Sequence, residues 1–232
     1  MCNSRTATEV YNQRILLKRL GAYRREVDNR RALVDLSRAV RALRRGKFTL
    51  DETRGWEGRA AACYWPSLKL LAREDWIFKG LRRRRQGFDP FNVAVDALSW
   101  MLCRETAQAL DRAGLDPALG LLHETRDGAA ALAYDLAEEF RAPVVEAAAM
   151  AFFARNEMRQ EHFMPADEGG VRFTREGYRT LIRAYEAWLA RAIADPQTGD
   201  KMLWRGLMLR QAQRLAAAME GAAPYLAYKM DY

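Results

Sequence analysis

Four residues in the middle of the sequence carry side chains that could together bind a divalent metal ion. Glu57, His123, Asp135 and Glu138 supply three carboxylates and one imidazole. An oxygen-rich set with one nitrogen suits a hard cation such as Mg²⁺ or Mn²⁺. The chain also carries a net charge of +8, which favours a polyanionic partner. Together these features predict phosphodiester chemistry on nucleic acid.

Each of these residues also has an ordinary structural explanation. Glu57, followed by small residues, could be a solvated glutamate in the first turn of a helix. His123 follows two leucines, where a histidine is commonly half-buried and hydrogen-bonded. Asp135 and Glu138 project from one side of a helix, where a surface ion pair is the default, and Glu139 could reach that side too. The residues alone do not choose between Glu138 and Glu139.

An arginine run lies between the first two candidate ligands. Arg82-Arg83-Arg84-Arg85 precedes a turn at Asp89-Pro90. Such a run is usually a solvated face, but here it could hold phosphates near the metal. Further basic clusters occur at 24–25, 30–31, 41–47 and 201–214. Most of the interleaved aromatic residues are expected in the core, although some could stack on bases; they are Trp56, Tyr64, Trp65, Trp76 and Phe88.

Several functional classes are disfavoured by what the sequence lacks. It has no Gly-x-Gly-x-x-Gly, Gly-Lys-Ser/Thr, Gly-x-Ser-x-Gly or His-x-x-x-His pattern, which argues against nucleotide-driven motors, serine hydrolases and His-x-x-x-His zinc enzymes. Cys2, Cys63 and Cys103 are too few for a disulfide framework. The N-terminus has no apolar signal core, and the apolar stretch 144–154 is too short to span a membrane. We expect a cytoplasmic protein with no membrane partner.

Helical periodicity dominates the chain. Phe91, Val95, Leu98 and Leu102 place one apolar stripe on a helix face. Helices are predicted over 31–43, 144–153, 175–193 and 201–219, with breaks at 89–90, 114–117, 142–143 and 195–199. The predicted fold is an all-α, multi-helix domain with one small β-hairpin near 162–173. We expect a single domain, 1–232, comprising an N-terminal helical segment (1–50), a metal-site core (51–193) and a C-terminal helix and tail (194–232).

Four segments, in their order and spacing, resemble the CRISPR adaptation integrase family, Cas-one. They are Glu57-Gly58 with Ala60-Ala61 and Tyr64, then Arg84-Arg85 with Asp89-Pro90 and Asn92, then Gly114-Leu115-Asp116-Pro117 through Leu122-His123, then Tyr134-Asp135-Leu136-Ala137-Glu138-Glu139-Phe140-Arg141. The resemblance covers roughly Tyr11 to Tyr185 and implies a fold like the C-terminal helical domain of that family.

The resemblance implies a DNA integrase that uses Mg²⁺ or Mn²⁺. Glu57, His123 and Glu138 would bind the metal, with Asp135 an adjacent acidic residue of the same catalytic site. The 3′-hydroxyl of a short DNA fragment would attack a phosphodiester at the leader–repeat boundary of a CRISPR array, and the same site could run the reverse reaction or act as a nonspecific nuclease. The candidate DNA contacts are Arg59, Tyr64, Arg82, Arg83, Arg84, Arg85, Tyr134 and Arg141.

The family resemblance also sets expectations for assembly. Typical members carry an N-terminal β-rich domain that helps dimerisation, and Glu57 comes too early to leave room for it. We therefore expect either a naturally short form or a helical domain cut from a longer protein. Its partners would be DNA and further copies of itself, as a dimer or higher homo-oligomer, while the need for the Cas-two partner protein stays open. The alternatives are a metal nuclease that never joins strands and a non-catalytic helical DNA-binding module.

Overall fold

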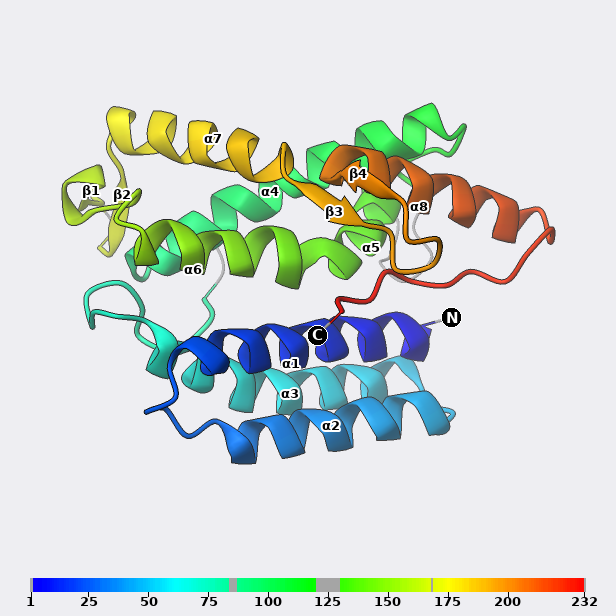
Figure 1. Cartoon of the computed structure of the whole chain (residues 1–232), viewed down its shortest axis with the longest axis horizontal. Coiled ribbons are helices and arrows are strands. Elements are labelled where there is room, and N and C mark those ends of the chain that lie inside the picture. Colours follow the sequence, from blue (N-terminus) through cyan, green and yellow to red (C-terminus); the bar gives the residue numbers. More distant parts are fainter. Residues whose placement is uncertain (1, 84–86, 120–129, 168, 232) are drawn as a thin grey trace.

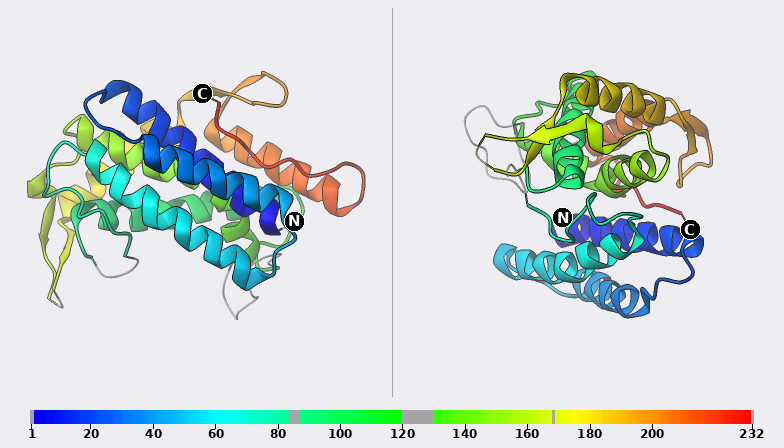
Figure 2. Two further views of the ribbon diagram at one scale, coloured as in Figure 1. Left: turned by 90° about the horizontal axis from the view of Figure 1, so that it is seen from below. Right: turned by 90° about the vertical axis from the view of Figure 1, so that its left-hand side faces the viewer.

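The helices pack in two layers, seen edge-on in Figure 1 and along the layers in the right-hand view of Figure 2. The computed structural model describes residues 2–83, 87–119, 130–167 and 169–231. One layer holds α1 (Cys2–Tyr23), α2 (Arg30–Arg45) and α3 (Leu50–Leu71). The other holds α4 (Pro90–Arg112), α5 (Ala131–Phe140), the π-helical turn η1 (Arg141–Glu146), α6 (Ala147–Ala154), α7 (Arg175–Leu189) and α8 (Trp204–Met219).

Short polar signals fix where the helices of the site begin. Thr49 and Glu52 form a capping box at the start of α3, each side chain satisfying a backbone N–H of the other's residue. Asp89 caps α4 by accepting from the N–H of Asn92 at 2.7 Å, and Pro90 occupies the first helical position. These caps set the register in which each helix presents its side chains.

The core lies between the layers and receives residues from all three predicted parts of the chain. The predicted apolar stripe of α4, Phe91 to Leu102, is fully buried in it. Within the described residues, no helix is long and apolar enough to cross a membrane.

The all-α prediction is confirmed, and so is the hairpin near 162–173. Strands β1 (Phe163–Pro165) and β2 (Val171–Phe173) pair antiparallel, with Phe163 opposite Phe173. A short 3-10 turn, η2 (Gln160–His162), leads into β1.

A second hairpin was not predicted. Strands β3 (Ala192–Ala194) and β4 (Lys201–Leu203) take up the ends of the segments predicted as helices 175–193 and 201–219. Asp195, fully buried between them, accepts from the N–H of Gln197 and from the side chains of Arg210 and Arg214. The hydrogen bonds to buried Asp195 hold this turn and override the helix propensity of the flanking segments.

The chain from α5 to α6 also differs from the prediction. The expected break at Ala142-Pro143 is absent, and the backbone widens there into the π-turn η1, where the N–H of Ala147 bonds the carbonyl of Ala142. Proline cannot donate to an α-helical ladder, and the wider turn accommodates it. As a result α5, η1 and α6 form one continuous helical segment that crosses the core.

Candidate metal and DNA site

A small cavity opens where α1, α3 and η1 meet. Its volume is about 210 Å³, and it is lined by Glu9, Val10, Gln13, Glu57, Ala61, Trp65, Arg82 and Arg141. Three of the residues predicted for the site therefore meet here although they are far apart in sequence: Glu57, Arg82 and Arg141.

Helix α3 presents one face to this cavity. Glu57 and Ala61 line it, as their spacing predicts. Tyr64, one turn further on, is 0% exposed, and its hydroxyl donates to Glu146 Oε2 at 2.6 Å. The prediction that Tyr64 contacts DNA is therefore wrong for this structure, because the ring is in the core and the hydroxyl is bound to a buried carboxylate.

Arg141 is the central cation of the site. Its Nη1 lies 3.1 Å from Oε1 of Glu9, and both side chains are largely buried. Burial raises the pKa of Glu9 to about 8, against the opposing effect of Arg141, and the negative charges of Glu138, Glu57 and Glu146 raise it further. One guanidinium thus faces an excess of carboxylates drawn from α1, α3, α5 and η1.

The three acidic residues of α5 separate into different roles. Asp135 is fully buried, with Oδ2 3.8 Å from Nη1 of Arg5. Glu139 is 1% exposed and accepts from the Tyr225 hydroxyl at 2.5 Å, the Tyr228 N–H at 2.8 Å and Gln211 Nε2 at 3.0 Å.

These contacts favour Glu138 over Glu139 as the site residue, a choice that spacing left open. Glu139 accepts hydrogen bonds from Gln211 of α8 and from Tyr225 and Tyr228 of the C-terminal segment. Glu138 is half-buried and adds to the negative potential at Glu9. Among the acidic residues of α5, Glu138 alone combines partial exposure with an electrostatic effect on Glu9.

Arg82 forms a fixed wall of the cavity. Its side chain is 8% exposed, with Nη2 at 2.5 Å from Asp96 and Nη1 at 3.1 Å from the Asn92 side-chain oxygen. The cap at Asp89 holds Asn92 in turn. A phosphate that reached Arg82 would meet a guanidinium already oriented.

The other predicted DNA contacts lie on the surface or outside the described residues. Arg59 and Arg83 are exposed and lie over aromatic rings, that of Trp56 at 5.1 Å and that of Phe88 at 4.6 Å respectively. Tyr134 is 44% exposed. His123, Arg84 and Arg85 fall in the segments that the structure does not describe.

The donor chemistry fits a hard divalent cation. Glu57 and Glu138 offer carboxylate oxygens, the ligands that hard cations prefer. Their negative charges raise the pKa of Glu9, and a bound cation would offset this repulsion between carboxylates. Within the described residues, no three His, Cys, Asp or Glu side chains come together closely enough to hold a metal. His123, the third ligand that the family resemblance implies, lies outside those residues.

Two carboxylates of the site were missed by the sequence reasoning. Glu9 and Glu146 face Arg141 from α1 and η1, and both are buried. A signal exists in α1, where Glu9, Asn12 and Gln13 interrupt a run of apolar residues that face the core. Buried polar side chains on a core-facing helix mark a network or a site, because each needs a partner.

Comparison with known sequences gives one consistent family. The model of the family described as CRISPR associated protein Cas1 matches residues 2–187. The chain is 35% identical over 174 residues to the "CRISPR-associated endonuclease Cas1 3" of Thermus thermophilus, covering 75% of this chain and 52% of that relative. It is 36% identical over 198 residues to "CRISPR-associated endonuclease Cas1 1" of the same organism, covering 84% and 62% respectively. The chain thus spans less than two thirds of either relative.

Solved structures share the fold. A Cas1 protein from Thermotoga maritima has a TM-score of 0.80 at 20% identity, covering 95% of this chain and 65% of that one. A casposase bound to integration product also gives 0.80 at 20% identity, covering 100% and 65%. A chain of a Cas6-RT-Cas1–Cas2 complex gives 0.84 at 22% identity, covering 100% and 25%. At these identities the likeness concerns the arrangement of helices.

Proposed function

Because this chain belongs to the Cas1 family of CRISPR-associated proteins, we propose that it is the helical catalytic part of a metal-dependent DNA integrase. The reaction is transesterification, in which the 3′-hydroxyl of a short DNA fragment attacks a phosphodiester at the leader–repeat boundary of a CRISPR array. The alcohol oxygen forms the new P–O bond, and the 3′-oxygen of the target strand leaves. The names of the relatives, CRISPR-associated endonuclease Cas1, support chemistry on phosphodiesters.

One observation carries the proposal. Two carboxylates of the family-like set, Glu57 from α3 and Glu138 from α5, act on the same buried carboxyl group of Glu9, beside a cavity that Arg82 and Arg141 line. This arrangement places acidic residues next to two fixed guanidinium groups. Carboxylates and arginines in one cavity suit a substrate that is a phosphodiester, because the phosphate is an anion and a metal ligand at once.

The residues would divide the work as follows. Glu57, Glu138 and His123 would hold Mg²⁺ or Mn²⁺, which when bound supplies Lewis-acid activation of the phosphate and of the attacking hydroxyl. Arg141 and Arg82 would provide positively charged guanidinium groups whose orientation is set before the DNA binds. Glu9 orients Arg141, and Asp96 orients Arg82. Asp135 keeps α5 in place through Arg5.

The proposal extends to assembly. Joining both ends of a fragment needs two active sites, so the working form would be a dimer or a higher homo-oligomer on DNA. Structural neighbours include Cas1 in complexes with Cas2, which makes the Cas-two protein a candidate partner. Light scattering on the protein with and without a short duplex tests the self-assembly, and a monomer under active conditions would contradict it.

A single assay separates this function from its two alternatives. The protein is incubated with Mn²⁺ or Mg²⁺, a supercoiled plasmid carrying a CRISPR array, and a labelled short duplex. Label joined to the plasmid supports the integrase. Nicking without joined label supports a nuclease that never joins strands, which the relatives' endonuclease names favour as the second candidate. Retarded DNA with neither product supports a binding module.

The variant His123→Ala tests the metal site directly. We expect strand joining and nicking to disappear, because a ligand is lost, while DNA binding in EDTA stays within a few fold of the wild type. Glu220→Gln, a change of one exposed carboxylate at the end of α8, serves as the matched control and should keep full activity. Unchanged joining by His123→Ala would remove this residue from the site.

A further inference from the structure

The positive charge of the chain is concentrated in one short stretch. Residues 30–47, which comprise α2 and the two residues after it, contain seven basic residues and one acidic residue, a net charge of +6. The rest of the chain has 31 basic and 29 acidic residues, and so contributes only +2 of the total of +8. This stretch therefore accounts for most of the net positive charge of the chain.

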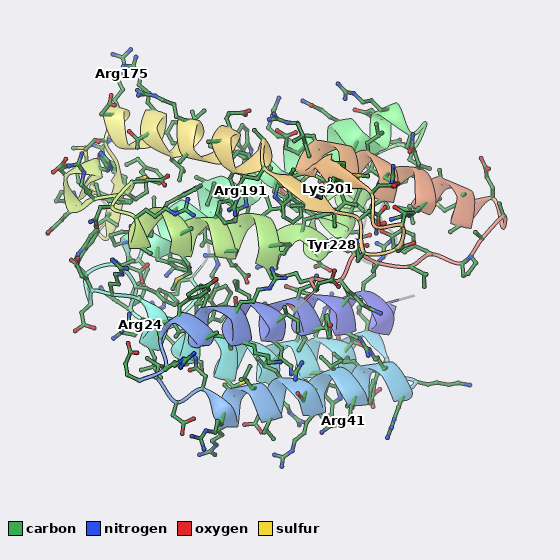
Figure 3. All side chains as sticks on the ribbon, viewed as in Figure 1. Arg24, Arg41, Arg175, Arg191, Lys201 and Tyr228 are labelled. Carbon is green, nitrogen blue, oxygen red and sulfur yellow. The ribbon has the colours of Figure 1, made fainter. Side chains whose placement is uncertain are left out.

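The fold places this charge on an outer surface. Helix α2 buries Ala32, Leu36, Ala39, Val40 and Leu43 against α1 and α3, and turns its opposite face away from the rest of the molecule. Arg41 projects from that face at the lower edge of Figure 3. Every basic side chain of residues 30–47 is exposed: Arg30, Arg31, Arg38, Arg41, Arg44, Arg45 and Lys47.

Most of these cations are not engaged by carboxylates. Arg30 and Arg38 pair with Asp28 and Asp35 respectively, and Arg44 lies over the ring of Tyr11. Arg31, Arg41 and Arg45 make no ion pair with any described residue, and they lie within one stripe of the helix surface, because their spacings of ten and four residues keep them on one side. At 1.5 Å per residue the stripe is about 21 Å long, the length of roughly six base pairs of duplex DNA.

The stripe is unfavourable for the helix itself. Arg30 and Arg31 stand in the first turn, which contains no acidic residue, although the helix dipole disfavours positive charge there. Arg41 and Arg45 repel each other at a separation of four residues. Folding alone gives no reason for this arrangement, whereas binding to a line of phosphates does.

We infer that the outer face of α2, defined by Arg31, Arg38, Arg41 and Arg45, is a second DNA-contacting surface that binds the backbone of a duplex away from the catalytic cavity. The inference rests on the proposed function only in taking DNA as the partner. The face offers few groups for reading bases and only one large apolar side chain, Val34, so it would contact phosphates irrespective of sequence. The lack of aromatic anchors also distinguishes it from a membrane-binding helix.

The test compares two triple variants that remove equal charge from opposite faces. Arg31→Gln, Arg41→Gln and Arg45→Gln together neutralise the α2 face, and glutamine keeps a helix propensity close to that of arginine. The control combines Arg172→Gln, Arg175→Gln and Arg179→Gln, exposed residues of β2 and α7 on the other layer, where Arg175 projects at the top of Figure 3. Binding of a labelled linear duplex without a CRISPR repeat is measured by anisotropy in EDTA, between about 50 and 200 mM salt.

We expect the α2 triple variant to reduce the slope of log affinity against log salt by about 2 to 3, since each phosphate contact contributes about 0.9. Affinity should fall at least about tenfold, and equally on unrelated sequences. The control should keep both quantities. A triple Arg→Lys variant at the α2 positions should restore the slope, because lysine also binds phosphate as a point charge. Circular dichroism confirms folding, and the single Arg→Gln variants, each lowering the slope by about 1, replace the triple if it unfolds.

Three outcomes would overturn the inference: a wild-type slope in the α2 variant, an equal loss in the control, or no rescue by lysine. These results are distinct from failure of the proposed function. If the wild type joins no strands but the α2 variant loses slope, the surface stands and the integrase does not. If the wild type joins strands but the α2 variant keeps the wild-type slope, the integrase function stands and the second DNA-contacting surface does not.

Discussion

At the scale of single residues, the site is organised around an arginine that the sequence reasoning had treated only as a DNA contact. Arg141 is held by Glu9, a residue of the N-terminal segment to which no part of the site had been assigned. That Glu57 and Ala61 share a helix face could be predicted, because helical periodicity is local. The pairing of Glu9 with Arg141 could not be predicted, because it is a contact between residues 132 positions apart.

The raised pKa of Glu9 predicts a specific dependence of stability on pH. The folded protein keeps this carboxyl protonated up to a pH of about 8, whereas its ordinary pKa is 4.5, so unfolding releases a proton between these values. The free energy of unfolding therefore falls as pH rises through that window, by up to about 1.4 kcal/mol per pH unit. Glu9→Gln removes this term, and its melting temperature relative to wild type should rise from pH 5 to pH 8 in EDTA.

The matched control for this experiment is Glu161→Gln, an exposed carboxylate next to the hairpin. Its difference from the wild type should stay constant over the same pH range. A constant difference for Glu9→Gln as well would show that Glu9 titrates like an ordinary carboxyl group.

At the scale of elements, the C-terminal segment after α8 acts as a clamp on α5. The carboxylate of Glu139, next to the candidate site residue Glu138, accepts hydrogen bonds from Tyr225 and Tyr228 of this segment and from Gln211 of α8. The sequence pattern located α8 itself but not the segment, because an extended chain without regular structure has no periodicity to read. The partners of Glu139 lie mostly in that segment, so spacing along α5 alone could not distinguish the role of Glu139 from that of Glu138.

The variant Tyr225→Phe tests the clamp. It removes one hydrogen bond to a carboxylate that is 1% exposed. We expect a loss of about 1–3 kcal/mol in the free energy of unfolding, the cost of a weakened buried acceptor, with faster amide exchange in α5. Tyr23→Phe, at a position that is 86% exposed, is the control and should change neither. Equal stabilities of the two variants would mean that the clamp contributes nothing.

At the scale of the whole molecule, two helical layers and the C-terminal segment meet at Asn12. Its side chain, 0% exposed, donates to the carbonyls of Glu139 and Tyr228 at 2.9 and 3.1 Å and accepts from the N–H of Met230 at 2.9 Å. Helical periodicity predicted an all-α fold, and that prediction is confirmed. Periodicity could not predict how the layers are joined, because the Asn12 amide binds three backbone groups from segments distant in sequence.

Asn12→Ala should therefore loosen the assembly of the layers. Three buried backbone groups lose their partner, and we expect a cost of about 2–4 kcal/mol, measured as a lower urea midpoint. Limited proteolysis should then cut the C-terminal segment before the helices unfold. Gln108→Ala, an exposed change on α4, should leave both measurements unaltered. Resistance of the Asn12 variant to early cleavage would contradict the proposed role.

The pairing of Glu9 with Arg141 also has a consequence for protein synthesis. The cavity joins a residue near the start of the chain to one made 132 residues later. A ribosome adds roughly 5–20 residues per second, so Glu9 is synthesised on the order of ten seconds before Arg141. A nascent chain has no assembled cavity during that interval. Under the proposed function, cutting or joining of DNA would begin only once the second layer has been translated and docked.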